Sequence, residues 1–152
     1  LVDPPDAIEP YHLGQGLAAS GGVVSGRAVF MIDRIDELRK KFPGDRLILI
    51  RPETNPEDVV GMEKSDGILT CIGGMTSHAV LQMRRLEKSG VSDFSIMHID
   101  EENNQAFVEY ASAEDGHVLV REGDFITIDG STGNVYMGYH RTRKHGMPAD
   151  VN

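Results

Sequence analysis

One short segment combines residue types that suit phosphate chemistry around an imidazole: Gly73-Gly74-Met75-Thr76-Ser77-His78-Ala79-Val80. Its two glycines permit positive φ and a turn free of side chains. Thr76 or Ser77 can cap the helix that follows, and the unpaired N–H groups at such a helix start bind phosphate. The same field disfavours imidazolium, so we expect His78 to stay neutral and nucleophilic.

The same residues have two plainer interpretations. Two glycines followed by two hydroxyl residues also form an ordinary loop and cap with an exposed histidine, so the motif needs support from the rest of the chain. A serine hydrolase built on Ser77 and His78 is disfavoured, because neighbouring residues in a helical turn point in different directions. The chain also has no Gly-x-Ser-x-Gly elbow.

Other side chains able to do nucleophilic or metal chemistry give weaker signals. Cys71, the only cysteine, leads into the segment above, where a small buried side chain is a better interpretation than a nucleophile. No histidine has a metal-type spacing, and we predict no metal site in this domain. The remaining histidines are His12, His98, His117, His140 and His145.

Composition excludes several classes of protein. A formal net charge of −9 over 152 residues disfavours binding to nucleic acid or anionic membranes. The apolar runs are too short for a membrane span, and the first ten residues lack the apolar run of a signal peptide. A single cysteine suits a reducing cytoplasm. Because the sequence opens at Leu1, we expect a domain cut from a longer protein.

The first half of the chain alternates strands with helices. Its prolines predict a linker over residues 1–13, and glycines predict a turn-rich covering segment over 14–26. Strands are expected at 27–32, 46–51 and 68–70, and helices at 35–42, from Asn55 to Gly67, and at about 76–88. In the helix from Asn55, the apolar side is expected to come from Val59, Val60 and Met62. In the helix at 76–88, a stripe of Ala79, Met83 and Leu86 should face the sheet.

The second half alternates strands with turns. Its strands are expected at 94–99, 105–110, 118–120, 125–129 and 134–137. The chain should therefore form an α/β domain, with a parallel, helix-covered part joined to a β-hairpin-rich part. We place this domain at 14–138 and a C-terminal linker or tail at 139–152.

Three segments resemble the phosphohistidine (swivelling) domain of phosphoenolpyruvate-utilising enzymes, most closely the pyruvate, phosphate dikinases. They are residues 49–58, 67–79 and 122–136, and their order and spacing agree with the family across roughly 14–138. The middle segment is also shared with phosphoenolpyruvate synthases and with enzyme I of the sugar phosphotransferase system. The first and third segments favour the dikinase.

The resemblance implies a swivelling β/β/α fold and a phosphoryl group carried on Nε2 of His78. This domain would sit between a nucleotide-binding domain and a pyruvate-binding domain of one polypeptide, in a cytoplasmic enzyme that forms a homodimer. Mg²⁺ and ATP or AMP are expected in the neighbouring domains, with no cofactor in this one.

The resemblance also implies roles for individual residues. Gly73, Gly74 and Ser77 would position the phosphoryl group. Thr76 would be the target of a regulatory kinase and phosphorylase, because a dianion there repels a phosphoryl group on His78. The candidates for the active surface, at predicted strand ends, are Thr70, Arg51 and Glu53.

Two departures from the family leave alternatives open. The usual arginine before the glycine pair is Ile72 here, which removes a cation that could steer phosphate. Residues 86–94 also diverge, so we expect the strand there to be shifted along the chain. A second interpretation is the phosphohistidine domain of a phosphoenolpyruvate synthase or enzyme I. A third is a catalytically silent interaction or regulatory domain of the same fold.

Overall fold

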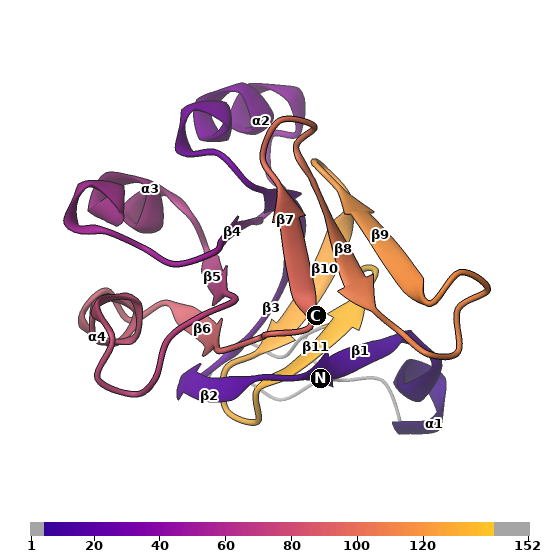
Figure 1. The fold of residues 1–152 in the computed structure, drawn as a ribbon. Helices are drawn as coiled ribbons and strands as arrows, with labels where there is room; N and C mark the ends of the chain where they lie inside the picture. The colour runs from indigo at the N-terminus through magenta and orange to yellow at the C-terminus, as the bar shows by residue number, and fades with distance from the viewer. Residues whose placement is uncertain (1–4, 142–152) are drawn as a thin grey trace.

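A computed structural model of the protein describes residues 5–141, which form two sheets and a set of short helices (Figure 1). The large sheet has eight strands: β1 (His12–Gln15), β2 (Leu17–Ser20), β3 (Val23–Val29), β4 (Leu47–Arg51), β5 (Gly67–Thr70), β6 (Ser89–Ser92), β10 (Phe125–Asp129) and β11 (Asn134–Met137). The small sheet has three: β7 (Met97–Asp100), β8 (Gln105–Glu109) and β9 (His117–Arg121). The helices are α1 (Pro5–Ile8), α2 (Ile35–Lys41), α3 (Val59–Lys64) and α4 (His78–Arg85), with 3₁₀ turns at Glu9–Tyr11, Ile32–Arg34 and Pro56–Asp58.

The large sheet joins a parallel centre to antiparallel flanks. Its order is β1-β11-β10-β3-β4-β5-β6-β2, with β3 to β6 parallel and the other pairings antiparallel. Helices α2, α3 and α4 lie on one side of the parallel strands, and the antiparallel small sheet lies on the other (Figure 1). The predicted α/β class is therefore confirmed, with a small sheet, a large sheet and helices as its three layers.

Strand β4 shows why the fold has two cores. Four consecutive apolar residues of this strand, which lies within the predicted range 46–51, are fully buried. Leu47 and Leu49 pack in the cluster under the helices, whereas Ile48 and Ile50 pack in the cluster that includes the small sheet. Because side chains alternate across a strand, a run without polar residues fits a strand covered on both faces.

The large sheet closes on itself through the chain at Gly16. Strands β1 and β2 stand at opposite ends of the strand order, yet only this residue separates them. Its N–H donates to the carbonyl of Gly133 at 2.8 Å, and a Cβ here would lie 2.6 Å from the carbonyl oxygen of Ser92. A glycine is therefore required where the two ends of the sheet meet.

The N-terminal segment differs from the prediction. Residues 5–11 form helical turns instead of a linker, because proline is compatible with the first positions of a helix. Residues 14–26 lie mostly in strands β1, β2 and β3 instead of forming a turn-rich cover, since glycines here accommodate close backbone approach within the sheet. Residues 1–4 of the expected linker lie outside the described residues.

Three further expectations need correction. The strand after α4 is at Ser89–Ser92, and the predicted strand at 94–99 begins only at Met97, because Phe94 is a buried loop residue. In α3 the side chain of Val60 is 58% exposed, because the neighbouring Gly61 is the residue that packs against Ile32. In the expected tail, residues 139–141 run along the domain and His140 is buried; residues 142–152 lie outside the described part.

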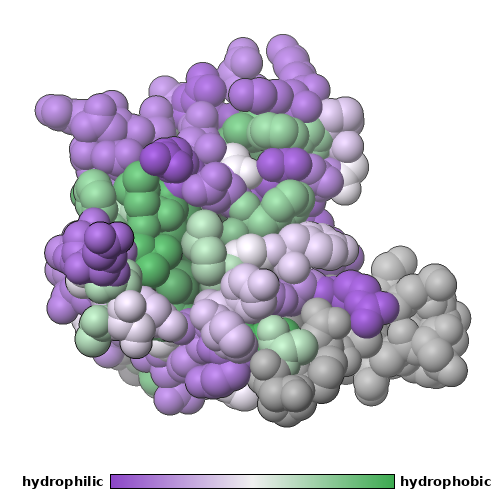
Figure 2. Space-filling model, turned by 90° about the vertical axis from the view of Figure 1, so that its right-hand side faces the viewer, coloured by the Kyte–Doolittle hydropathy of each residue, from purple (hydrophilic) through white to green (hydrophobic). Residues whose placement is uncertain are grey.

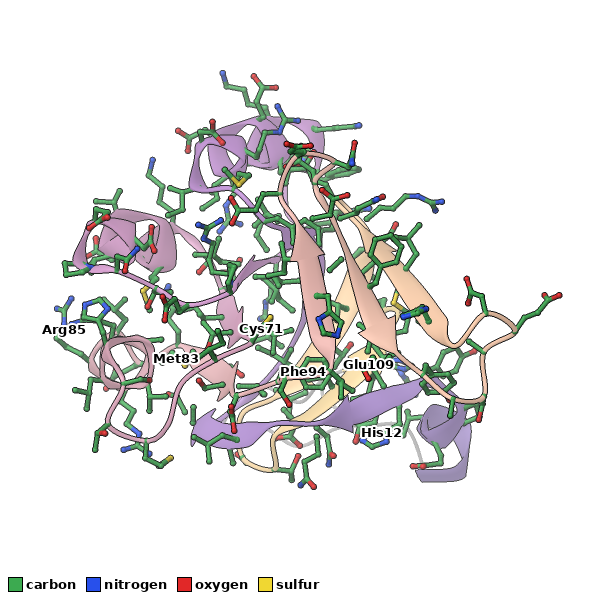
Figure 3. All side chains as sticks on the ribbon, viewed as in Figure 1. His12, Cys71, Met83, Arg85, Phe94 and Glu109 are labelled. Carbon is green, nitrogen blue, oxygen red and sulfur yellow. The ribbon has the colours of Figure 1, made fainter. Side chains whose placement is uncertain are left out.

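Helix α4 packs through the predicted stripe. Ala79, Val80 and Met83 are buried, with Leu86 partly buried against the same cluster. Met83 lies on the side of the helix that faces the sheet, whereas Arg85 lies on the far side (Figure 3). The predicted start near residue 76 is two residues early. None of the helices in the described part of the chain is long and apolar enough to cross a membrane.

Candidate active site

The candidate site stands at the edge of the large sheet where parallel strands β4, β5 and β6 end. The loop that follows β5 is anchored there by its backbone: the N–H groups of Cys71 and Ile72 donate to the carbonyl of Pro52 at 3.1 and 3.0 Å. Carboxyl ends of neighbouring parallel strands are where side chains from separate loops converge. His78, the first residue of α4, therefore stands beside the loop after β4 as well as its own.

The glycine pair and Ser77 shape the turn before α4. Gly73 has φ +133°, and a Cβ on it would lie 2.9 Å from the hydroxyl oxygen of Ser77. The N–H of Ser77 donates to the carbonyl of Gly74 at 3.0 Å. The side-chain oxygen of Ser77 accepts the N–H of Val80 at 3.4 Å. Of the two predicted capping residues, Ser77 is the cap, and Thr76 is exposed in the turn.

The imidazole of His78 meets a side chain that sequence reasoning missed. Its Nδ1 lies 3.4 Å from the hydroxyl oxygen of Thr54, a long contact in which the tautomer decides the donor. Thr54 is buried and sits between β4 and the helical turn at Pro56. That turn begins as predicted, with the Asn55 N–H donating to the carboxylate of Asp58 at 2.9 Å. The only signal for Thr54 was its place within the first family-like segment.

Two further residues, Thr70, which was predicted at the surface, and Ser92, which was not predicted, lie beneath the loop before His78. Thr70 and Ser92 end β5 and β6, both fully buried, and their hydroxyl oxygens are 2.8 Å apart. The Ser92 hydroxyl donates to the carbonyl of Gly73 at 3.0 Å. Thr70, a predicted surface candidate, thus lies in the interior, because the last residue of a central strand stays covered. Ser92 lies in the divergent segment, which gave no signal.

The two charged candidates lie apart from the imidazole. A terminal nitrogen of Arg51 donates to the carbonyl of Phe30 at 2.7 Å and lies 3.7 Å from a carboxylate oxygen of Glu101. These contacts hold the guanidinium against the end of β3 and the β7–β8 turn. Glu53 is exposed. Among the described contacts, neither Arg51 nor Glu53 touches His78.

Apolar side chains are exposed on the segments around His78. The exposed fractions are 57% for Ile72, 42% for Met75 and 51% for Leu81, and Val60 of α3 is exposed as well. Beside the loop, a groove of about 370 Å³ runs between Ile72 and β7. The position where the family usually has arginine is therefore a solvent-facing hydrophobic residue.

Cys71 fits the structural interpretation given to it. It is buried among core residues at the loop start, and burial raises the pKa of its thiol to about 11 (Figure 3). A thiol of this kind is a poor nucleophile near neutral pH. Within residues 5–141, no cluster of three or more histidine, cysteine or acidic side chains is arranged to hold a metal ion.

The small sheet carries two exposed histidines, His98 and His117. Nε2 of His98 lies 2.7 Å from a carboxylate oxygen of Glu109 on the neighbouring strand, and both side chains are more than half exposed. Phe107 is directly opposite His98 in the register, two residues from Glu109 on the same strand, and is 37% exposed. Figure 2, which views the side of the molecule that carries β9, shows an apolar area bordered by hydrophilic residues.

Comparison with known proteins finds one matching family and relatives that agree with it. The family described as PEP-utilising enzyme, mobile domain, matches residues 43–133. Pyruvate, phosphate dikinase of Clostridium symbiosum is 39% identical over 132 residues, which is 87% of this chain and 14% of that protein. The dikinase of Entamoeba histolytica is 43% identical over 126 residues, 83% of this chain and 13% of the relative. The chain thus spans about a seventh of the length of these relatives.

Proposed function

The chain belongs to the family of mobile domains of phosphoenolpyruvate-utilising enzymes, and on that premise we propose that it is the phosphoryl carrier of a pyruvate, phosphate dikinase-like enzyme. His78 would shuttle a phosphoryl group between a nucleotide-binding domain and a phosphoenolpyruvate- or pyruvate-binding domain of the same polypeptide. The whole enzyme would then be a phosphotransferase of the dikinase type.

The observation that carries this proposal is the contact between Thr54 and Nδ1 of His78. A neutral imidazole has one N–H, and with that hydrogen on Nδ1, directed at the Thr54 oxygen, Nε2 keeps its lone pair. The ring stands at a helix N-terminus, partly exposed, where other domains can reach it. Nε2 is therefore the proposed phosphoryl acceptor.

The transfer itself needs one nucleophile. The Nε2 lone pair forms a bond to phosphorus while the bond from phosphorus to the enol oxygen of phosphoenolpyruvate breaks. The released enolate takes up a proton at carbon to become pyruvate. Because such a transfer asks little covalent chemistry of the protein, most of the catalysis is positioning and charge stabilisation. Gly73, Gly74 and Ser77 are proposed to position the phosphoryl group.

Neighbouring domains are proposed to supply what this domain lacks. The exposed apolar residues Ile72, Met75 and Leu81 suit transient docking against them. Mg²⁺ and ATP or AMP would be held in those domains. Thr76, exposed two residues from His78, is the proposed regulatory phosphorylation site, where added negative charge would oppose the phosphoryl group.

The proposal is tested by intact-mass measurement after the full-length protein meets phosphoenolpyruvate. One phosphate should be gained, labile in acid and stable in base, and peptide mapping should locate it on His78. Residues 1–152 alone should not turn over pyruvate and nucleotide. A native protein that gains no phosphate would instead support the silent interaction domain, and label on another residue would overturn the carrier role of His78.

A further inference from the structure

The loop before His78 is held from beneath by a directed pair of hydroxyl groups. Ser92 has a single hydroxyl hydrogen, and the structure directs it to the carbonyl of Gly73 at 3.0 Å. The contact of 2.8 Å between Ser92 and Thr70 must then use the Thr70 hydrogen. The donors therefore run in one direction, from Thr70 to Ser92 to the Gly73 carbonyl.

Both hydroxyl groups lie where the loss of a hydrogen-bond partner would be destabilising. Thr70 and Ser92 have no exposed surface. Strands β5 and β6 are parallel neighbours with Leu69 opposite Val91, so Thr70 and Ser92 follow as the next pair along the two strands. Water cannot replace either partner there without opening the strand ends. The position of the Gly73 carbonyl is thus fixed by the sheet.

Fixing the Gly73 carbonyl also orients the N–H of Gly74, because the two belong to the same peptide group. In a planar trans peptide, C=O and N–H point in opposite directions. Because the Gly73 carbonyl points inward to Ser92, the N–H of Gly74 points outward. Gly74 is exposed, a Cβ on it would meet no atom within 4 Å, and its N–H has no partner among the described hydrogen bonds.

We propose that Ser92, supported by Thr70, is a positioning residue for phosphoryl transfer through His78: it holds the Gly73–Gly74 peptide so that the Gly74 N–H can bind an oxygen of the transferring phosphoryl group. This inference rests on the proposed carrier function. Outward backbone N–H groups fixed before the reaction stabilise anionic oxygens without further rearrangement. Ser92 acts through the loop and does not itself contact the phosphoryl group.

The same sheet offers a matched control for a buried hydroxyl pair. The Thr127 hydroxyl lies 2.9 Å from the Ser25 oxygen and 2.9 Å from the carbonyl of Gly138. Thr127 is fully buried and Ser25 is buried, on neighbouring strands β10 and β3. Removing this pair disturbs a buried threonine, a serine and a glycine carbonyl that do not belong to the loop before His78.

The test measures the single-turnover rate of His78 phosphorylation by phosphoenolpyruvate in the full-length protein. Ser92→Ala should lower this rate by about 10- to 100-fold, since small displacements of positioning groups have effects of this size. The concentration of phosphoenolpyruvate for half-maximal rate should stay unchanged. Ser25→Ala should lower the melting temperature as Ser92→Ala does, but leave the rate within about twofold, as expected for an independent site.

Two further comparisons separate positioning from simple destabilisation. Thr70→Val should slow the reaction and Thr70→Ser should restore it, and the double variant with Ser92→Ala should be no slower than Ser92→Ala alone. Gly74→Ala keeps the proposed N–H donor and Gly74→Pro removes it, so the proline variant should be slower than the alanine variant by about the factor that Ser92→Ala loses.

Three results would overturn the inference: a native rate in Ser92→Ala, an equal loss in Ser25→Ala, or equal rates in Gly74→Ala and Gly74→Pro. Each of them leaves the carrier function standing if native protein is still labelled on His78. Failure of the carrier function is a different result, because the native protein would then gain no phosphate on that residue.

Discussion

His98 and His78 each lie near the oxygen of another side chain, and their surroundings differ. His98 stands on the outer face of the small sheet, 2.7 Å from the carboxylate of Glu109, with both side chains open to solvent. His78 stands at the edge of the large sheet, 3.4 Å from the neutral hydroxyl of buried Thr54. The shorter contact is the more exposed one, between side chains of two neighbouring strands.

The two regions differ in the groups that they hold around the imidazole. The strand-end edge brings together a helix N-terminus, a glycine turn and a buried hydroxyl, each from a different segment of the chain. On the small sheet the carboxylate beside His98 comes from a neighbouring strand, and exposed pairs of this kind are worth little to stability. A reactive imidazole is therefore better identified by the convergence of backbone and neutral groups than by the length of one contact.

The largest expected effect comes from exchanging each histidine for asparagine in the full-length protein. His78→Asn should abolish labelling by phosphoenolpyruvate, whereas His98→Asn should be labelled like the native protein. Both variants should unfold within about 1 kcal/mol of the native protein, because neither side chain belongs to the core. Labelling and thermal unfolding are measured together. Residual label in His78→Asn, or loss of label in His98→Asn, would break the contrast between the two regions.

A carboxylate beside His78 should be harmful, although one beside His98 is part of the native structure. Thr76→Glu should reduce phosphoryl occupancy of His78 on the order of a hundredfold, since two unit charges at about 6 Å and an effective dielectric near 20 repel by roughly 3 kcal/mol. Quantitative mass spectrometry of the His78 peptide measures this. Thr76→Gln is the neutral control, and equal losses in both variants would assign the effect to bulk instead of charge.

The interior behind the loop should be dry, in contrast to the exposed small sheet. Burial raises the pKa of Cys71 from 9.0 to about 11, so its thiolate fraction near pH 8 should be about a hundredfold below that of the unfolded chain. Iodoacetamide alkylation of the Cys71 peptide, native against urea-unfolded, checks this.

The same shift affects stability at alkaline pH. The folded state favours the neutral thiol, so this contribution is complete below pH 9.0 and is lost as the pH rises toward 11, by about 3 kcal/mol once both states are ionised. In the alkylation test, equal modification of Cys71 in native and unfolded chains would mean that the start of this loop is open to water.

The smallest effect is expected from the neutral partner of His78. Thr54→Val should lower the phosphorylation rate by roughly tenfold, because the ring loses the group that orients Nδ1. Thr54→Ser should keep most of the rate, since the hydroxyl is retained. Rapid-quench labelling gives both rates. A native rate in Thr54→Val would mean that the helix start alone orients the imidazole.

Local patterns were enough to predict the part of the site that lies along one segment. The glycine turn, a cap at Thr76 or Ser77 and the helix behind His78 depend on neighbouring residues, and all three are found. Thr54 and Ser92 could not be found this way. They reach the loop through the pairing of β4, β5 and β6, and nothing within their own segments distinguishes them from other buried hydroxyl residues.

The same distinction between local and long-range features applies to the fold. The strand predicted at 46–51 is found as β4, because its four consecutive apolar residues suit a strand covered on both faces. Residues 14–26 were misjudged because their glycines were interpreted as turns, whereas Gly16 and Gly26 lie where backbones approach closely. That approach depends on Ser92 and Arg46, which are far away in sequence. Glycine alone does not distinguish a turn from a crowded strand.

The junction at Gly16 also sets the order in which the domain can be completed during synthesis. β2 pairs with residues 90–92, and β1 pairs with residues 134–136. These two strands leave the ribosome before either partner exists, and β1 must wait until the last strand has emerged. A nascent chain stopped short of residue 134 would hold one end of the sheet closed and the other open. Completion of the domain therefore reports that translation has passed β11.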